Sequence, residues 1–226
     1  MPVEDHRAIA LLVGGDDLQQ RALDVLATWS PPDEGRVRCL VRVDGAPFAG
    51  THFEELCPDL EPWDVALDIW GPTPEATTAP FAGLRERLGD AIDAERSTVL
   101  AGAQWRARKP PTDYGLTFCV TRKADLDHQG FVDYWRNNHA MIPLPMLRTF
   151  CQFYVDAAGS SALAAGAGLP AGTLDGISEP TYRDEDHFRE LTLDPRVRVG
   201  ARDDEFNFID HSRSAAALFR TVEERS

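Results

Sequence analysis

The chain has 226 residues, of which 43% are hydrophobic, and a formal net charge of −14. Its length suits one large domain or two domains of about 100–110 residues each. The acidic excess argues against nucleic acid and anionic membrane surfaces as partners, because both bind basic patches. The sequence has no apolar run of about 18 residues and lacks the basic start of a signal peptide. We therefore expect a cytoplasmic protein with no membrane partner.

The four cysteines, Cys39, Cys57, Cys119 and Cys151, form no CxxC pair. None has a histidine close in sequence, and a nucleophilic thiol needs a neighbouring base, so we expect buried, reduced thiols. Histidine spacings typical of metal sites do not occur, and neither do GxGxxG phosphate loops or GxSxG nucleophile turns. The sequence therefore predicts neither a metal nor a cofactor.

The first half of the chain alternates strand-like and helix-like segments. Apolar runs and period-two alternation predict strands, and apolar residues at helical spacing predict helices. In chain order we expect a strand at residues 8–13, a helix at 18–29, a strand at 37–43, an irregular connection at 46–61, a strand at 63–70, a helix at 81–92 and a strand at 97–103. The predicted order is βαββαβ.

A basic, proline-rich linker at residues 107–113 divides a first domain, residues 1–106, from a second, residues 114–226. In the second we expect a strand at 116–121, a helix capped by Asp127, a strand at 150–155, a mobile loop at 160–172, a strand at 176–182, a short helix at 184–191, a last strand at 205–210 and a terminal helix from residue 215. The second half therefore repeats the βαββαβ order.

The two halves also match in detail. Residues 25–29 (VLATW) parallel residues 131–135 (FVDYW), and residues 39–44 (CLVRVD) parallel residues 151–156 (CQFYVD). Each βαββαβ unit would form a four-stranded antiparallel sheet with both helices on one face. We therefore predict an α+β protein of tandem ferredoxin-like repeats, whose sheets face each other around a partly hollow barrel.

The most informative segment is residues 131–140, which reads as an amphipathic helix ending in His139. The first half has no counterpart to this histidine and is a degenerate copy. An imidazole titrates near pH ~6.5 and can both take and give a proton, so His139 is the candidate general acid/base. The alternative is a structural histidine that caps the helix or bonds a loop carbonyl.

Around His139, residues 115–212 resemble the EthD family of the dimeric α/β-barrel group. The matching residues are Arg122, Phe131, Tyr134, Trp135, Arg136, His139, Ala140, Pro145, Arg148, Gln152, Asp175, Gly176, Glu179, Phe188, Phe208, Ile209 and Asp210. The resemblance implies an intramolecular barrel of the dimeric type and small, cofactor-free proteins of polyketide and aromatic metabolism, some of them dehydratases or cyclases. It also implies that His139 faces the barrel interior, close to Tyr134 and Trp135. The first half matches only in architecture.

Several further residues are candidates to bind substrate. They are Tyr134, Trp135, Gln152, Tyr154, Glu179 and Tyr182. Trp135 is also a core candidate, because it shares a helix face with Phe131 at i, i+4. Glu179 is a second acid/base group if it points inward and a surface charge if it points outward. We expect Arg122 to pair with a surface carboxylate. The remaining histidines predicted at the surface are His52, His128, His187 and His211.

The favoured function is a cofactor-independent lyase or cyclase, catalysing dehydration or aldol-type cyclisation of a polyketide-like or aromatic ketone. One alternative is a non-catalytic small-molecule-binding or accessory protein of an oxidative pathway. Another is a monooxygenase, either cofactor-free or with haem on His139. The expected partner is a small hydrophobic or aromatic substrate, and the chain is a monomer or a homodimer.

Overall fold

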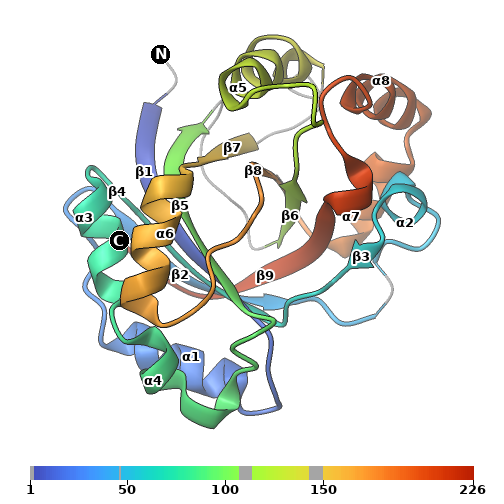
Figure 1. Ribbon diagram of the computed structural model, residues 1–226. Coiled ribbons are helices and arrows are strands. Elements are labelled where there is room, and N and C mark those ends of the chain that lie inside the picture. Colours follow the sequence, from blue (N-terminus) through green and yellow to red (C-terminus); the bar gives the residue numbers. More distant parts are fainter. Residues whose placement is uncertain (1–2, 46, 107–113, 143–149) are drawn as a thin grey trace.

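Eight strands close into an antiparallel barrel. The computed structural model describes residues 3–45, 47–106, 114–142 and 150–226. Around the barrel the strands follow the order β2-β4-β1-β5-β7-β8-β6-β9, and β9 pairs back onto β2 (Figure 1). Their bounds are β1 (Val3–Leu12), β2 (Arg36–Arg42), β4 (Val65–Gly71), β5 (Thr98–Arg106), β6 (Tyr114–Val120), β7 (Phe150–Val155), β8 (Gly176–Tyr182) and β9 (Ala215–Arg225). The short β3 (Asp59–Leu60) adds to β9 in parallel.

Each half of the chain supplies four barrel strands in the same spatial order. β1, β2, β4 and β5 come from the first half and β6 to β9 from the second, and in each set the order is second, third, first, fourth. The pairs β5–β7 and β2–β9 join the two sets. Closure by these two seams gives each of the eight strands a partner on both sides, which removes the exposed edges of an open sheet. The predicted linker, residues 107–113, lies outside the described residues.

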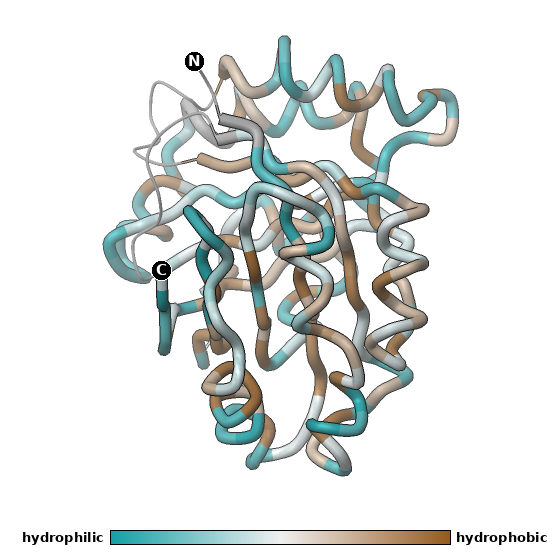
Figure 2. Tube along the Cα trace, turned by 90° about the vertical axis from the view of Figure 1, so that its left-hand side faces the viewer, coloured by the Kyte–Doolittle hydropathy of each residue, from teal (hydrophilic) through white to brown (hydrophobic). Residues whose placement is uncertain are grey.

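The barrel interior is filled by side chains. Alternate residues point inward, and the apolar ones include Ile9, Leu11, Leu40, Phe153 and Phe219. The outer faces of the strands carry two further apolar cores, one under the helices of each half. Figure 2 shows these hydrophobic stretches along the strands through the middle of the molecule. The interior is therefore a packed core and not the partly hollow space expected from the sequence.

Four charged side chains meet inside this core. The Arg7 Nε atom lies 2.7 Å from Asp68 Oδ1, and Arg38 Nη2 lies 2.5 Å from Asp68 Oδ2. Both guanidinium groups also pair with Glu179, at 2.7 and 2.8 Å. All four side chains are nearly inaccessible to solvent, with exposures of 4% or less. Two positive and two negative charges balance, so no net charge is left in the interior.

The helices lie in two groups on the outside of the barrel (Figure 1). The bounds are α1 (Leu18–Ala27), α2 (His52–Leu56), α3 (Pro74–Thr78), α4 (Leu84–Leu88), α5 (His128–Asn137), α6 (Ala157–Ala167), α7 (Glu185–Leu193) and α8 (Pro195–Glu205). Short 3-10 turns are η1 (Ala79–Phe81), η2 (Gly89–Ala91), η3 (His139–Met141) and η4 (His211–Arg213). None of the helices in the described ranges combines the length and apolar character of a membrane span.

One helix from each half lies over the strands of the other half. In α2, from the first half, Phe53 contacts Phe118 on β6 with ring centroids 5.2 Å apart. In α6, from the second half, Ser160 bonds both the amide and the carbonyl of Ala101 on β5. The boundaries expected at 1–106 and 114–226 therefore divide the chain in sequence, while the packing crosses between the halves.

Several predicted elements near the ends and connections were wrong. Residues 160–172, expected to be a loop, contain most of α6, because its alanines favour helix. The connection at 46–61 contains α2 and β3. The helix expected at 81–92 is broken at Gly83 and Gly89, whose φ angles of 64° and 59° require glycine.

The C-terminal elements were also assigned wrongly. Residues 205–210 were predicted as the last strand, but α8 ends at Glu205 and turns follow it. The last strand is β9, where a terminal helix was expected. Pairing with β6 and β2 overrides the helical propensity of its alanines, because Ala217 and Phe219 fill the interior while Leu218 packs under the helices.

All four cysteines are buried thiols outside any disulfide, which confirms their prediction. Burial, with a contribution from Glu223, raises the pKa of Cys39 to about 12. Burial likewise raises the pKa of Cys57 to about 12. Cys39 belongs to the core under the helices, whereas Cys151 alternates with Gln152 and shares the inward side of β7 with Phe153. The sequence match between Cys39 and Cys151 therefore pairs residues on opposite faces of their sheets, as a one-residue offset would.

Candidate functional site

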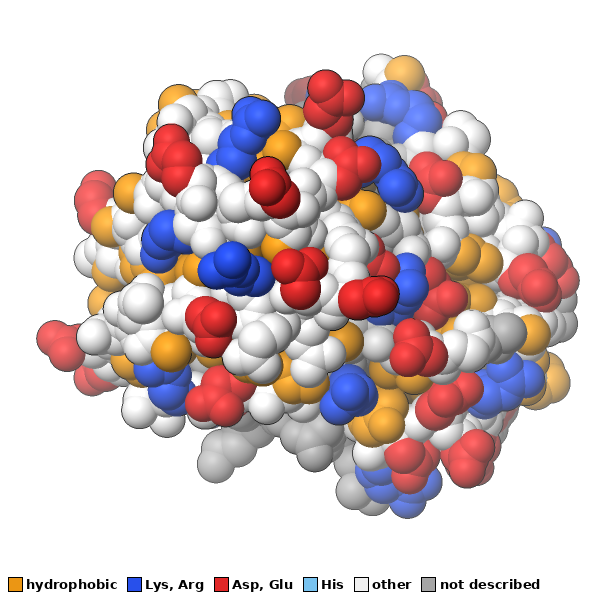
Figure 3. Space-filling view, turned by 90° about the horizontal axis from the view of Figure 1, so that it is seen from below, with side chains coloured by type: hydrophobic (Ala, Val, Ile, Leu, Met, Phe, Trp, Pro, Cys, Tyr) orange, Lys and Arg blue, Asp and Glu red, His pale blue; other side chains and the backbone are white. Residues whose placement is uncertain are grey.

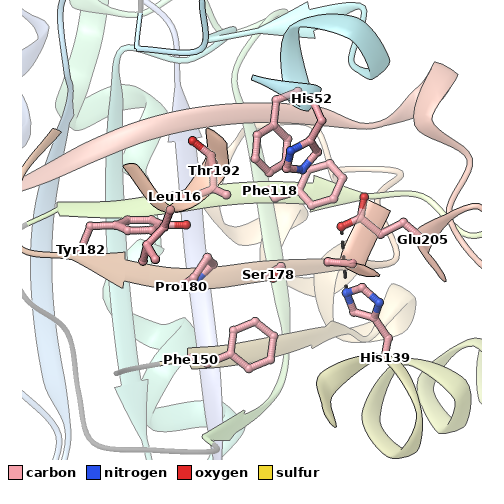
Figure 4. A pocket seen from close by; sticks show the side chains of 13 residues that line it. His52, Leu116, Phe118, His139, Phe150, Ser178, Pro180, Tyr182, Thr192 and Glu205 are labelled. Atoms are coloured by element: carbon pink, nitrogen blue, oxygen red, sulfur yellow. Dashed lines mark ion pairs between the residues drawn. The ribbon is translucent and has the colours of Figure 1, made fainter. Parts of the chain in front are cut away.

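A small cavity lies outside the barrel, between the outer face of β6 and β8 and the elements α2, η3, α7 and α8. Its volume is about 60 Å³. It is lined by His52, Phe53, Leu116, Phe118, His139, Phe150, Ser178, Pro180, Tyr182, Leu191, Thr192, Ala201 and Glu205. Figure 4 shows His139 and Glu205 at one end and Tyr182 at the other. Because ligand pockets usually have ~300 Å³ or more, the cavity is too small for a drug-sized ligand.

His139 sits where α5 stops. The helix ends at Asn137, and Asn138 turns the chain into η3, of which His139 is the first residue. Its ring lies 5.0 Å from the ring of Phe208, and its side chain is 7% exposed. The expectation that His139 faces the barrel interior is wrong. The helix packs on the outer face of the sheet, so a residue at its end reaches the space between helix and sheet.

Asp204 orients the imidazole. The His139 Nδ1 atom lies 2.9 Å from Asp204 Oδ2, and an ionised carboxylate can only accept, so Nδ1 carries the proton. Tyr134 donates its hydroxyl proton to the other oxygen of Asp204 at 2.7 Å. Asn207 donates to the same oxygen at 3.3 Å. The hydrogen bond to Asp204 raises the pKa of Tyr134, and the phenol stays protonated. The network leaves Nε2 of His139 available at the cavity.

Glu205 faces that second nitrogen. Its Oε1 lies 3.9 Å from His139 Nε2, and its Oε2 lies 3.1 Å from His211 Nε2. Burial alone would raise the pKa of Glu205, but the hydrogen bond from His211 and the nearby His139 and His52 hold it below its ordinary value. The cavity therefore has a fixed negative charge beside the imidazole.

Apolar and aromatic groups make up the rest of the cavity wall. Phe118, Phe150 and Tyr182 line it from the sheet, and His52 and Phe53 line it from α2. Burial raises the pKa of Tyr182, so its hydroxyl is neutral. The surroundings suit a flat, weakly polar molecule, with the ionisable groups gathered at the His139 end (Figure 4).

Three of the predicted substrate-binding residues lie beneath α5 and not at the cavity. Trp135 is 1% exposed and packs on Phe131 with ring centroids 5.2 Å apart, which confirms the predicted core pair. The Tyr154 hydroxyl donates to Gln152 Oε1 at 2.6 Å, and Gln152 Nε2 donates to the Trp135 carbonyl at 3.3 Å. These contacts hold the end of α5 on the sheet and so support the position of His139.

Glu179 lies on the other face of the sheet from the cavity. Its neighbours in β8, Ser178 and Pro180, line the cavity, while Glu179 points into the barrel. The surface-charge interpretation of Glu179 is therefore wrong, and its inward position does not bring it to His139. Burial would raise its pKa, but the charges of Arg38 and Arg7 outweigh burial and hold it below the ordinary value. Arg122 pairs with a carboxylate as predicted, but that carboxylate, Asp175, is buried and not at the surface.

Sequence reasoning missed Asp204 and Glu205 and assigned two buried histidines to the surface. His52 is 3% exposed and His211 is 7% exposed, so those two predictions are wrong. His128 is exposed as expected, with 45% of its side chain accessible. The pair Asp194-Pro195 is a helix-start signal that would have predicted the start of α8, the helix that carries Asp204 and Glu205. No local signal marks His52. The family positions 145 and 148 lie outside the described residues.

The side chains present do not fit haem. The Glu205 carboxylate faces His139 Nε2 at 3.9 Å, on the side from which a haem iron would have to approach that nitrogen. A cavity of about 60 Å³ also has no room for a porphyrin. Over the described ranges, no group of three His, Cys, Asp or Glu side chains is arranged to hold a metal ion.

Comparison with solved structures supports the barrel. An anthrone oxidase-like protein matches with a TM-score of 0.59 at 10% identity, covering 99% of this chain and 93% of the other. A candidate monooxygenase from Fusobacterium nucleatum matches with a TM-score of 0.53 at 8% identity, covering 99% and 94%. A candidate chlorite dismutase matches with a TM-score of 0.50 at 11% identity, covering 98% and 96%. At these identities the likeness concerns the fold alone.

Comparison with families and curated sequences concerns the second half of the chain. No curated protein matches the chain. The model of the EthD domain matches residues 123–212, the segment that contains α5, His139, Asp204 and Glu205. The chain thus forms an α+β fold with an eight-stranded antiparallel barrel, similar to these solved structures, and its residues 123–212 match the EthD domain.

Proposed function

We propose that the protein is a cofactor-independent lyase or cyclase that acts on an aromatic or polyketide-like ketone, with His139 as general acid/base. The observation that carries this proposal is the 2.9 Å contact between His139 Nδ1 and Asp204 Oδ2. It fixes the tautomer and leaves Nε2 as a base at the end of an aromatic-lined cavity. The same arrangement of a carboxylate behind an imidazole activates histidine in hydrolases.

The chemistry needs one base and one acid. Nε2 of His139 removes a proton from the carbon next to a ketone, and the resulting imidazolium is stabilised by Asp204 on one side and Glu205 on the other. In a dehydration, the imidazolium then returns its proton to the departing hydroxyl group. In an aldol cyclisation, the proton goes to the new alkoxide. Positioned acid/base groups of this kind contribute ~10²–10⁴-fold to the rate.

A substrate must open the cavity before it can react. The cavity volume of about 60 Å³ is smaller than a bicyclic ketone. The wall opposite the sheet consists of short elements, α2, η3 and the end of α8, which are easier to displace than the strands of a closed barrel. Among the candidate residues, Tyr182 and His139 line the cavity directly, and Tyr134 acts on His139 through Asp204. Trp135, Gln152 and Tyr154 act as supports.

An oxygenase is the second candidate function, because it would share its first step, removal of a proton from carbon by His139, with the lyase or cyclase. A carbanion formed by His139 in an aromatic ketone can react with oxygen without a cofactor. The fold is similar to that of an anthrone oxidase-like protein and of a candidate monooxygenase. Product masses separate the two, since dehydration loses one water and oxygenation gains oxygen. Oxygen consumption by the protein with an aromatic ketone would favour the second candidate.

His139→Ala tests the proposal, with His128→Ala as the matched control because His128 is exposed and outside the cavity. Turnover of a panel of aromatic β-hydroxy ketones and linear polyketide mimics is followed by mass spectrometry. We expect His139→Ala to lose activity by ~10²-fold or more, with an unchanged melting temperature, while His128→Ala keeps it. Full activity in His139→Ala would remove the assignment. Tight binding without turnover in the wild type would favour a carrier or accessory role.

We also infer that the two halves descend from one ferredoxin-like unit. The shared strand order of the two sets of four strands supports this inference. A second subunit is then unnecessary for barrel closure, which is compatible with a monomer or with a homodimer through another face. Figure 3 shows acidic and basic side chains interspersed on one face, a distribution that suits a soluble partner-free surface more than a basic nucleic-acid patch. The proposed partner is a small aromatic molecule, and the proposed location is the cytoplasm.

A further inference from the structure

His211 lies between the enclosed cavity and an open groove. On the cavity side, its Nε2 atom bonds Glu205 Oε2 at 3.1 Å. On the other side, it lines a groove of about 530 Å³ together with Lys123, Asp125 and Phe206. The ring is held between two aromatic side chains, with centroids 4.9 Å from Phe206 and 6.3 Å from Phe118. An ionisable ring that touches both spaces can exchange protons with each.

Glu205 connects His211 to His139. One carboxylate oxygen lies 3.9 Å from His139 Nε2 and the other lies 3.1 Å from His211 Nε2. The carboxylate is 8% exposed, so water has little access to it except through the neighbouring groups. The three side chains come from η3, the end of α8 and η4, and they form one continuous row from the cavity to the groove.

We propose that Glu205 and His211 form a proton path that links His139 to solvent in the groove. This proposal rests on the proposed function and deepens it, because the path returns His139 to its neutral form whenever the imidazole holds a proton that the substrate does not take back. Glu205 and His211 act through His139 and touch no substrate in this scheme, so they are positioning and relay residues.

Each transfer moves one proton between neighbouring groups, and the number of protons on the three side chains is restored at the end of the cycle. Inward, solvent protonates His211 at Nδ1, its Nε2 proton passes to Glu205, and Glu205 passes a proton to Nε2 of His139. His211 is then neutral with its proton on Nδ1. Outward, the His139 imidazolium gives its Nε2 proton to Glu205, Glu205 gives a proton to His211 Nε2, and His211 releases Nδ1–H to solvent. The outward step restores the first tautomer, so the two directions alternate without a net change.

The surrounding charges suit a transient proton carrier. The groups that act on Glu205 are His139 from η3, His211 from η4, His52 from α2 and the Cys57 thiol. Together the histidines keep the Glu205 pKa below its ordinary value, so the carboxylate is ionised at rest and gives up an accepted proton readily. The groove carries both Lys123 and Asp125, which leaves solvent access without a strong local charge.

Hydrogen exchange at the His139 ring tests the path without any substrate. The exchange rate with water of the proton on His139 Nε2 is measured by NMR on protein labelled at histidine nitrogen, at a pH low enough for the imidazole to carry that proton. The variants are His211→Phe, which keeps the ring stack, and Glu205→Gln, which keeps a hydrogen-bonding side chain of the same size. We expect both to slow exchange by about 10²-fold, because each removes one carrier of the proton. His128→Phe, an exposed histidine, serves as the control and leaves the rate unchanged.

Rescue by a small molecule provides the second arm. In His211→Ala, added imidazole can enter through the open groove and restore exchange at His139. Slowing in only one of the variants, or in neither, overturns the path, and so does the absence of rescue by imidazole. Failure of the proton path can be distinguished from failure of the proposed function. Full activity in His139→Ala would contradict the catalytic assignment, but it would not change the exchange rates measured in the Glu205 and His211 variants.

Discussion

At the residue scale, the neighbours of His139 fix the tautomer and the orientation of its imidazole. Asp204 selects the tautomer of His139, Tyr134 and Asn207 hold Asp204, and Glu205 places a negative charge on the far side of the ring. An isolated histidine at a helix end would have neither orientation nor a proton partner. The two carboxylates, which sequence reasoning missed, supply the orientation and the charge that the proposed base needs.

Asp204→Asn tests the orientation of His139. The amide keeps the size of the carboxylate, but it can also present its NH₂ group to Nδ1 and stabilise the wrong tautomer. We expect kcat to fall by about 10²–10⁴-fold with little change in KM. Steady-state kinetics on the substrate identified with the wild type measure this split. Asp203→Asn, an exposed neighbour, is the control, and equal kcat in both variants would contradict the orienting role.

At the scale of elements, α5 delivers His139 to the cavity. Its start is fixed by Asp127, whose Oδ1 accepts a hydrogen bond from the Gly130 amide at 2.7 Å. Its end is fixed by Trp135, which packs against the sheet over Gly176, where a Cβ atom would come within 2.4 Å of the indole. The short elements α2 and η3 line the cavity on the side opposite the sheet. Because α2 comes from the first half of the chain and packs on β6 of the second half, both halves contribute to the site.

Asp127→Ala tests the cap of α5. Loss of the side-chain acceptor leaves an amide at the helix start without its bond, and we expect the free energy of unfolding to fall by about 1 kcal/mol. Denaturant unfolding followed by circular dichroism gives the value. Asp125→Ala, a nearby exposed aspartate in the same turn, should cost much less. A loss in Asp125→Ala as large as in Asp127→Ala would show that charge, and not capping, stabilises the helix.

At the scale of the whole molecule, a charged cluster joins the two halves inside the barrel. Arg7, Arg38 and Asp68 come from the first half and Glu179 comes from the second. A buried ion pair contributes little net stability compared with apolar packing, but removal of one partner leaves an uncompensated charge. The cluster therefore penalises any pairing of the two sheets that separates these residues.

Glu179→Gln tests this arrangement. We expect it to lower the free energy of unfolding by about 3–5 kcal/mol, because two buried arginines lose a counter-charge. Glu224→Gln breaks a half-exposed pair with Arg36 and should cost about 0–1 kcal/mol. Urea unfolding at pH 7 compares the two variants. Similar small losses would contradict a structural role for the cluster.

Acid should destabilise the fold through its buried carboxylates. The pKa of Glu179 and of Glu205 in the folded protein lies below the ordinary 4.5. Their contribution is therefore complete above pH 4.5 and is lost as the pH falls through the folded values. We expect the melting temperature of the wild type to fall below that pH, and the Glu179→Gln variant to show a smaller decrease. A melting temperature independent of pH from 6 to about 3 would contradict this assignment.

The sequence by itself determined the local elements and the candidate base. Period-two runs predicted most barrel strands. The i, i+4 pair Phe131 and Trp135 predicted the buried face of α5, and the amphipathic pattern of residues 131–140 placed His139 at its end. These signals are local, because the side-chain period of a strand or helix is written in neighbouring residues. The alanines of β9 led to the wrong prediction of a terminal helix for the same reason, because the strands that pair with β9, namely β2 and β6, lie far away in the sequence.

Only the tertiary structure decided which distant residues meet. Asp204 is 65 positions from His139, and His52 reaches the cavity from the first half by way of α2. The face of a strand that carries Glu179 can be read from alternation only after the register is known, and a shift of one residue reverses it. The helices pack outside the closed barrel, so His139 lies between a helix and the sheet. Pairing of β5 with β7 and of β2 with β9 brings Glu179 next to Arg7 and Arg38 inside the barrel. The periodicity of the sequence specifies which face of a helix or strand is buried, and only the long-range packing specifies which residues that face contacts.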